Sequence, residues 1–142
     1  MIKTDIDYQK SVEKLKEDLH FIDEQKKKLS EMGLSGEQIN RAIEPSISFH
    51  EQLKEEVEYY EHIKRGDFEP IFNLENLGKT LIACRIYLGI SQKELADRLG
   101  VSSAQISRDE RNEYFGVTIE KIQRVMEALK ITSKTEIEIK TA

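Results

Sequence analysis

Apolar residues recur every three or four positions through the first half of the chain, which is the spacing of an amphipathic helix. In residues 8–32 the stripe consists of Val12, Leu15, Leu19, Ile22 and Leu29. In residues 37–60 it consists of Ile39, Ile43, Leu53, Val57 and Tyr60. Each stripe covers one helix face, so we predict two long helices that pack against each other through these faces.

Short signals mark the ends of these helices. Gly33 can adopt the left-handed conformation that often follows a helix. Ser35 and Gln38 have the spacing of a capping box, so the second helix is expected to begin there. Pro45 has no backbone N–H, and we expect a kink or a restart of the helix at that position. The short connection "GLSG" predicts an antiparallel hairpin.

The second half of the chain breaks into shorter segments. Helical patterns cover residues 77–88, 92–99, 103–111 and 118–129. The final stretch "KTEIEIK" alternates isoleucine with charged residues, which is the pattern of a short strand with one buried face. A lone strand needs an edge to pair with, and a second copy of the chain is one candidate.

Residues 91–112, "SQKELADRLGVSSAQISRDERN", contain two helix starts in close succession. Ser91 precedes Glu94 with the spacing of a capping box, and Ser102 precedes Gln105 in the same way. A helix that stops at Gly100 and restarts so soon afterwards has to change direction sharply. Two helices joined in this way cross at roughly 90–120°. We therefore predict a stiff corner whose second helix protrudes.

Small, glycine and apolar residues fall at fixed offsets through this corner. Those that characterise it are Gln92, Ala96, Gly100, Val101, Ile106, Ser107, Arg108 and Glu110. On these residues, the span from about Leu77 to Ile131 resembles the Cro and phage-repressor-like (Xre) helix-turn-helix family. The resemblance implies a lambda-repressor-like helical domain in which residues 103–111 read the major groove of DNA.

The resemblance also implies which side chains meet DNA. Gln92 and Ser102 are expected at phosphates, Ser102 together with the amides of its helix N-terminus. Arg108 is the expected reader of guanine, and Ala104 is expected against a thymine methyl group. The complete predicted set is Gln92, Ser102, Ser103, Ala104, Gln105, Arg108, Arg111 and Asn112.

Two further features bear on the packing of this domain. Arg85 and Glu110 match a pair that commonly forms a partly buried salt bridge in the family. Asp109 departs from the family pattern, because most relatives keep an apolar residue against the core there. We expect Tyr114 and Phe115 to supply the missing apolar contact.

Composition and charge agree with this reading once the two halves are separated. Charged residues make up 35% of the 142 residues, with only 7 glycines and 2 prolines, which favours a mainly α fold. The formal charge of −5 argues against nucleic acid. However, residues 1–70 carry a formal net charge of −6 and residues 71–142 carry one of +1. The second half is therefore compatible with binding a duplex.

Other kinds of site find no support in the sequence. Cys84 is the one cysteine, and the three histidines lack metal-ligand spacing. No phosphate loop and no nucleophile elbow is present. We therefore expect no enzyme activity, no metal and no cofactor. No apolar run is long enough to span a bilayer and the start lacks a signal peptide, so we expect a cytoplasmic protein without a membrane partner.

The predicted organisation has four parts. They are an acidic helical hairpin for dimerisation or partner binding (1–66), a linker (67–76), a helix-turn-helix domain (77–131) and a C-terminal strand (132–142). With the resemblance, this predicts a sequence-specific transcriptional regulator, a homodimeric repressor of a palindromic operator in double-stranded DNA. Two alternatives stay open: an antitoxin whose acidic hairpin or C-terminal strand covers a basic toxin, and an interaction module that has lost DNA binding.

Overall fold

The structure is a computed structural model that describes residues 1–141. These residues contain six α-helices and no strand, so the mainly α prediction is confirmed. The chain divides into two compact units, Met1–Asp67 and Phe68–Ala142. Helices α1 and α2 belong to the first unit, and helices α3 to α6 belong to the second.

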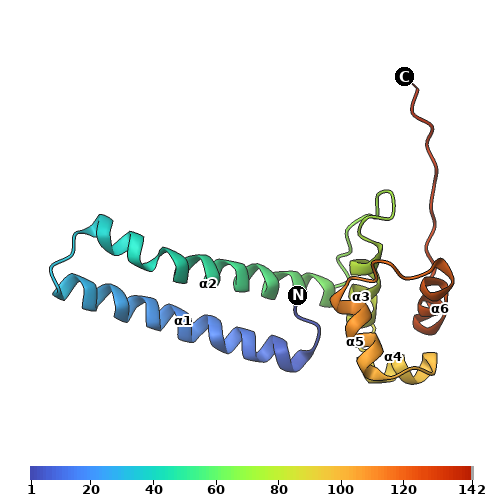
Figure 1. Ribbon diagram of the computed structural model, residues 1–142, viewed down its shortest axis with the longest axis horizontal. Helices are drawn as coiled ribbons and strands as arrows, with labels where there is room; N and C mark the ends of the chain where they lie inside the picture. The colour runs from blue at the N-terminus through green and yellow to red at the C-terminus, as the bar shows by residue number, and fades with distance from the viewer. Residues whose placement is uncertain (142) are drawn as a thin grey trace. The chain divides into compact units, whose positions relative to one another are not determined.

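The first unit is an antiparallel hairpin of α1 (Asp5–Glu31) and α2 (Gly36–Lys64), which run side by side (Figure 1). The backbone turns between them at Gly33, whose φ is +85°. The capping box predicted at the start of α2 is present. The Ser35 hydroxyl accepts from the Gln38 N–H, and the Gln38 side chain accepts from the Ser35 N–H.

Few side chains are buried in this hairpin. They are Ile2, Ile22, Ile43, Val57, Tyr60 and Ile63. The Tyr8 ring stacks on Tyr60 with ring centroids 5.0 Å apart. Leu19, which the stripe placed on the buried face, is 54% exposed, so that assignment is wrong. Each helix of a hairpin has only one neighbouring helix to pack on, and the edge of a broad apolar stripe stays outside that contact.

Helix α2 continues through Pro45 without interruption, so it does not restart there. A proline inside a helix removes one backbone hydrogen bond, which leaves the carbonyl of the residue four positions earlier without its donor. That residue is Arg41, and both it and Pro45 are exposed. Water can therefore bind the carbonyl, which lowers the cost of a continuous helix at this position.

Four short helices make up the second unit: α3 (Leu77–Tyr87), α4 (Gln92–Leu99), α5 (Ser103–Arg111) and α6 (Ile119–Leu129). Helix α4 packs on α5 and α6, and α3 packs on the same two helices. Their shared core consists of Leu81, Ile82, Ile86, Leu95, Ile106, Val125 and Leu129. The predicted segments correspond to these helices to within a residue at each end.

Two contacts hold the segments that flank these helices. The Phe68 ring lies edge-on to Tyr87 of α3 with centroids 5.5 Å apart, so the start of the predicted linker contacts α3. Gly78 of α3 lies against the loop that follows α5. A Cβ atom on Gly78 would lie 1.7 Å from the carbonyl oxygen of Glu113. Only a glycine lets α3 and this loop approach so closely.

The predicted C-terminal strand is not formed. Residues 132–141 have no regular secondary structure, and they extend away from the helices of their unit (Figure 1). Ile137 and Ile139 are 85% and 90% exposed. A strand needs a neighbouring strand for its hydrogen bonds, and residues 1–141 of one chain offer none. Ala142, the last residue of the prediction, lies outside the described residues.

Across residues 1–141, no helix is both long and apolar enough to cross a membrane.

Candidate nucleic-acid interface

The turn between α4 and α5 is built from three residues. Gly100 ends α4 in the left-handed conformation with φ of +68°. The Val101 N–H then donates to the Ala96 carbonyl at 3.0 Å, which closes the end of α4. Ser102 begins α5 by accepting from the Gln105 N–H at 3.1 Å. The sharp corner expected from the spacing is therefore fixed by a backbone conformation and by caps on both sides of it.

Apolar packing stabilises the inside of this corner. Leu95 and Ala96 of α4 and Ile106 of α5 are at most 1% exposed. Ala96 is small, which allows the two helices to approach closely where they meet. Val101, in the turn itself, is 38% exposed and contributes less to this packing. Ile106 is the one buried apolar residue of α5, so apolar contacts alone fix the orientation of this helix weakly.

A buried ion pair ties α5 to α3. The Arg85 guanidinium donates through Nε and Nη2 to the Glu110 carboxylate, the Nη2 contact measuring 3.0 Å, and the two residues are 2% and 1% exposed. Arg85 Nη1 donates to the Ile90 carbonyl at 2.8 Å, and the Gln92 amide donates to Glu110 at 2.7 Å. The burial of this pair exceeds the partial burial that the resemblance implied.

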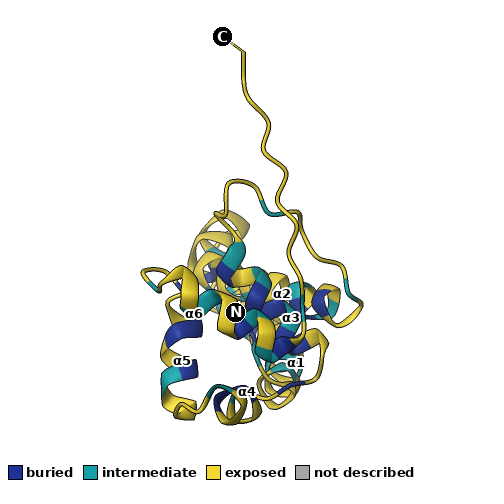
Figure 2. Ribbon diagram, turned by 90° about the vertical axis from the view of Figure 1, so that its right-hand side faces the viewer, coloured by how far each residue is buried: buried dark blue, intermediate teal, exposed yellow. Residues whose placement is uncertain are grey.

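These anchors leave one face of α5 in contact with solvent (Figure 2). The predicted DNA contacts at its start, its outer face and its end are exposed: Ser102, Ser103, Ala104, Arg108, Arg111 and Asn112. Gln105 is half-buried, and Gln92 is half-buried at the start of α4. Seven of the eight predicted residues therefore lie in α5 or at its two ends. The eighth, Gln92 of α4, contacts α5 through its hydrogen bond to Glu110.

Electrostatics favours an anion at the start of this face. The free backbone N–H groups and the positive end of the helix dipole lie at the N-terminus of α5, beside the Ser102 hydroxyl. The side chains of Arg108 and Arg111 add positive charge in the last turn of the same helix. Phosphates of a nucleic acid match both features.

Two residues that were not predicted to contact DNA support this face. Asp109 of α5 is 7% exposed, and its carboxylate forms an ion pair with Lys121 Nζ of α6 at 2.7 Å. The Gln105 amide donates to the same carboxylate at 3.0 Å, and Arg108 Nη2 donates to the Gln105 carbonyl oxygen at 2.9 Å. Gln105 therefore uses its side chain within α5 instead of completing a capping box with Ser102. The position of Lys121 in the sequence carries no signal of this pairing.

The Asp109 position was expected to rely on two aromatic residues, and one of them fulfils that role. Tyr114 is 4% exposed, whereas Phe115 is 70% exposed, so the expectation for Phe115 is wrong. Burial raises the pKa of the Tyr114 phenol, and the carboxylates of Glu110 and Asp109 raise it further. Tyr114 therefore stays neutral in the folded protein and adds no further negative charge beside Asp109, whose carboxylate pairs with Lys121.

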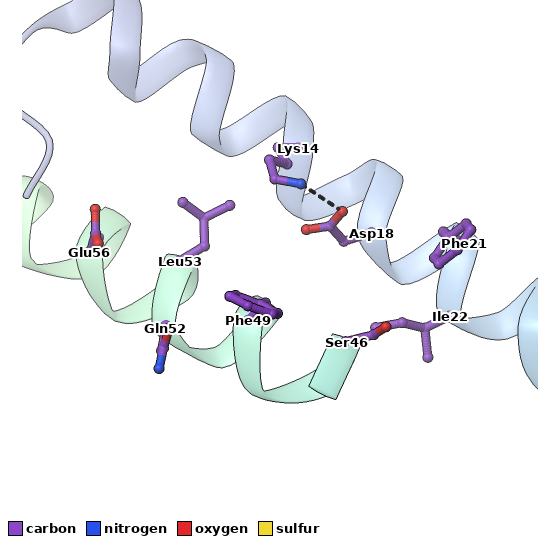
Figure 3. A pocket seen from close by; sticks show the side chains of 9 residues that line it. All are labelled: Lys14, Asp18, Phe21, Ile22, Ser46, Phe49, Gln52, Leu53 and Glu56. Atoms are coloured by element: carbon purple, nitrogen blue, oxygen red, sulfur yellow. Dashed lines mark hydrogen bonds and ion pairs between the residues drawn. The ribbon is translucent and has the colours of Figure 1, made fainter. Parts of the chain in front are cut away.

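A second candidate surface lies in the hairpin of the first unit. A groove of about 380 Å³ between α1 and α2 is lined by Phe21, Ile22, Phe49 and Leu53 (Figure 3). Phe21 is 52% and Phe49 is 71% exposed. Polar residues border the groove, including the Lys14–Asp18 ion pair at 3.2 Å. Exposed aromatic rings with a polar border are typical of protein–protein contact surfaces.

Metal chemistry has no visible basis in the part of the chain that is described. Residues 1–141 contain no group of three or more histidine, cysteine, aspartate or glutamate side chains that could hold a metal ion.

Comparison with protein families gives one match. Residues 81–137 match a family model described as helix-turn-helix, which is a DNA-binding regulatory domain and not an enzyme family. The match begins within α3 and covers α4, α5 and α6. Neither the curated proteins nor the solved structures gave a match to this chain.

Proposed function

Because the second unit carries a helix-turn-helix domain of the Cro/C1 type, we propose that this DNA-binding regulator is a sequence-specific, homodimeric repressor of transcription. The observation that carries the proposal is the exposed polar and basic face of α5, which follows directly after the corner at Gly100. In such domains the second helix of the corner lies in the major groove.

The proposal gives each exposed side chain a role. Arg108 can reach O6 and N7 of guanine with two parallel hydrogen bonds, and Ala104 can contact a thymine methyl group. Ser103 lies beside them at the start of α5. Ser102 and the amides of the α5 N-terminus contact a phosphate, and Arg111 with Asn112 follows the backbone past the end of the helix.

Gln92 can also contact a phosphate without giving up its internal bond. Its amide nitrogen carries two N–H groups, and one of them donates to Glu110 at 2.7 Å. The second N–H remains for a phosphate oxygen. Because Glu110 is itself held by Arg85, the contact would be made by a side chain of fixed orientation.

A single domain of this size gives too little contact for strong discrimination. One module buries only about 600–1,000 Å² on DNA, so a second copy is needed for useful specificity. A symmetric dimer binds a palindrome whose half-sites lie about one helical turn, or about 34 Å, apart. Occupied DNA of this kind is closed to RNA polymerase, which is the expected mechanism of repression.

We place the dimer contact at the hairpin groove between Phe21 and Phe49. Exposed aromatic rings on a hairpin with few buried residues support this assignment. Sedimentation of the full chain tests it: Phe49→Ser should shift the protein toward the monomer, while Ile137→Ser with Ile139→Ser should not. The opposite pattern would assign the dimer contact to the C-terminal segment and refute the assignment to the hairpin.

Binding to genomic DNA fragments tests the function itself. The full chain should select a small set of fragments and protect a palindrome in them. Arg108→Ala should cost about 1–3 kcal/mol of binding free energy and relax the preference at one base pair. Gln92→Ala should weaken binding to all DNA sequences by the same factor. Arg41→Ala, which removes an exposed arginine of the first unit, is the matched control and should change neither quantity.

Two results would count against the proposal. If the full chain selects no fragment even at low salt, the domain serves protein contact and not DNA binding. If the Arg108→Ala variant binds as tightly and as selectively as the parent, the assignment of α5 as the reading helix is wrong.

The acidity of the first unit favours one second candidate, an antitoxin. Residues 1–67 carry 11 lysines and arginines against 16 aspartates and glutamates, a formal charge of −5. An acidic surface with an apolar groove is complementary to a basic protein partner. The two candidates differ in what co-purifies: an antitoxin carries a small basic protein bound to residues 1–67, and a simple repressor does not.

A further inference from the structure

We propose that Asp109 and Lys121 are positioning residues, which hold Gln105 and Arg108 in the orientation that discriminates one base pair. This inference rests on the proposed function, because it concerns how the face of α5 reads DNA. It extends the site to α6, a helix with no predicted contact to DNA. The inference is drawn from four side chains that form a continuous series of polar contacts.

The chain of contacts runs from Lys121 of α6 through the buried carboxylate of Asp109 to the surface at Arg108. Lys121 Nζ lies 2.7 Å from one carboxylate oxygen of Asp109, which has no other polar partner among the described residues. The second carboxylate oxygen of Asp109 accepts from the Gln105 amide at 3.0 Å. The Gln105 carbonyl oxygen accepts from Arg108 Nη2 at 2.9 Å. Burial decreases along this path, from Asp109 at 7% exposure to the exposed Arg108.

The ionised carboxylate determines how the Gln105 amide is turned. A carboxylate without a proton only accepts hydrogen bonds, so the nitrogen of the amide has to face Asp109. The carbonyl oxygen of Gln105 then faces outward, where it accepts from Arg108. The reverse orientation would bring two acceptor oxygens together inside and two donors together outside. Lys121 places the opposite charge 2.7 Å from this carboxylate.

Arg108 gains from this arrangement without losing its ability to bind guanine. A guanidinium group carries five N–H donors, and Gln105 uses one of them. The remaining donors still include the pair needed for O6 and N7. A free arginine loses side-chain freedom when it binds, whereas one that is already oriented loses less. The structure thus explains why a charged residue is useful at position 109, where an apolar residue would pack but could not orient Gln105.

The neutralisation of Asp109 has a second consequence. A carboxylate close to the DNA-facing side of α5 repels phosphates unless a cation compensates it. Lys121 provides that cation from α6. Loss of Lys121 should therefore have two separable effects: weaker binding to every sequence and poorer discrimination at the base pair that Arg108 reads.

The experiment uses the full chain and an operator selected from genomic DNA, together with a set of operators that carry single base-pair changes. Asp109→Asn keeps the size of the side chain but lets the amide of residue 105 turn either way. Lys121→Gln removes the cation, and Lys121→Arg retains it. Lys79→Gln removes a lysine that makes a 3.9 Å ion pair with Glu113 in the same unit, and it is the matched control for charge. Circular dichroism and thermal unfolding establish that each variant is folded.

The expected result is a loss of about tenfold in discrimination at the Arg108 base pair for Asp109→Asn and for Lys121→Gln. Discrimination at the other base pairs should stay unchanged. Lys121→Arg and Lys79→Gln should retain the discrimination of the parent. In an Arg108→Ala background, Asp109→Asn should have no further effect on discrimination, because the side chain that it positions is gone. A structural role alone would not produce this dependence on Arg108.

Three outcomes would overturn the inference. Two of them leave the proposed function intact, and the third refutes both. If Arg108→Ala loses discrimination but Asp109→Asn and Lys121→Gln do not, the inference fails while the proposed function stands. If both variants reduce discrimination by the same factor at every base pair, Asp109 stabilises the fold and does not position Arg108. This result also refutes the inference and leaves the proposed function intact. If the parent protein selects no DNA, the proposed function fails and takes this inference with it.

Discussion

Replacing Glu110 with alanine should destabilise the second unit by about 3–5 kcal/mol, because it leaves the Arg85 guanidinium buried without its counter-charge. Arg85 and Glu110 are 2% and 1% exposed, so water cannot take over the lost contacts without opening the unit. Arg85 would keep its bond to the Ile90 carbonyl at 2.8 Å. The Gln92 amide would lose its acceptor as well.

This cost is large compared with the stability of the unit. The second unit spans residues 68–142. At roughly 0.05–0.15 kcal/mol per residue, a unit of this length has a free energy of unfolding of about 4–11 kcal/mol. The substitution therefore removes about a quarter of this free energy at one extreme and all of it at the other. A double variant, Arg85→Met with Glu110→Leu, should recover most of the loss, because apolar residues of similar volume remove both buried charges together.

Hydrogen–deuterium exchange of the full chain measures this effect without separating the two units. Peptides from α3 and α5 should exchange about a hundredfold to several thousandfold faster in the Glu110→Ala variant. The matched control is Glu37→Ala in the first unit, where Glu37 pairs with Arg41 at 3.0 Å on an exposed helix face. An exposed pair contributes at most about 1 kcal/mol, so exchange in α2 should change little.

The reasoning would be refuted by one clear result. If Glu110→Ala changes exchange in α3 and α5 no more than Glu37→Ala changes exchange in α2, the buried pair does not hold α5 in place. A double variant that is less stable than Glu110→Ala alone would contradict the explanation by uncompensated charge.

Two further predictions concern other contacts of the second unit. Gly78→Ala should destabilise it by at least about 1–3 kcal/mol, because the new Cβ would lie 1.7 Å from the Glu113 carbonyl oxygen. Gly36→Ala, with no atom within 4 Å, should be neutral or stabilising in the same urea titration, and equal effects would contradict the close approach. Burial and nearby carboxylates raise the pKa of Tyr114, so its contribution to stability is present below pH 10 and is lost as pH rises above 10. Relative to Tyr114→Phe, the parent should lose about 1.4 kcal/mol per pH unit there, and stability curves that stay parallel from pH 9 to 11 would refute this.

The corner and its caps could be predicted because their signals are local. Ser91, Gly100 and Ser102 each act on backbone groups within a few residues of themselves, so their spacing in the sequence is their spacing in the structure. The Ser35–Gln38 capping box is predictable for the same reason. The resemblance then supplied the pairing of Arg85 with Glu110, which lie 25 residues apart and share no local pattern.

The parts that could not be predicted depend on contacts between distant residues. Lys121 meets Asp109 only because α6 packs beside α5, and nothing in the spacing of the two residues indicates it. Gln105 looked like the second half of a capping box, in which its side-chain oxygen would accept from the Ser102 N–H. That oxygen instead accepts from Arg108, while its amide nitrogen donates to the buried carboxylate one turn later. The isoleucines of the C-terminal segment have the period of a strand, yet that pattern cannot supply the second strand.

The orientation of α5 depends on charge more than on apolar packing, and this separates two effects of salt. Two adjacent acidic residues tie the helix to its neighbours: Glu110 to Arg85 of α3 and to Gln92 of α4, and Asp109 to Lys121 of α6. These groups are buried or partly buried, so added salt screens them little. The arginines on the opposite face are exposed, and their contacts with phosphates weaken steeply as salt rises. Raising the salt concentration should therefore release DNA while hydrogen exchange in α5 stays as slow as before. Dissolved ions compete with the exposed arginines for the DNA phosphates, but they do not reach the buried charges that orient the helix.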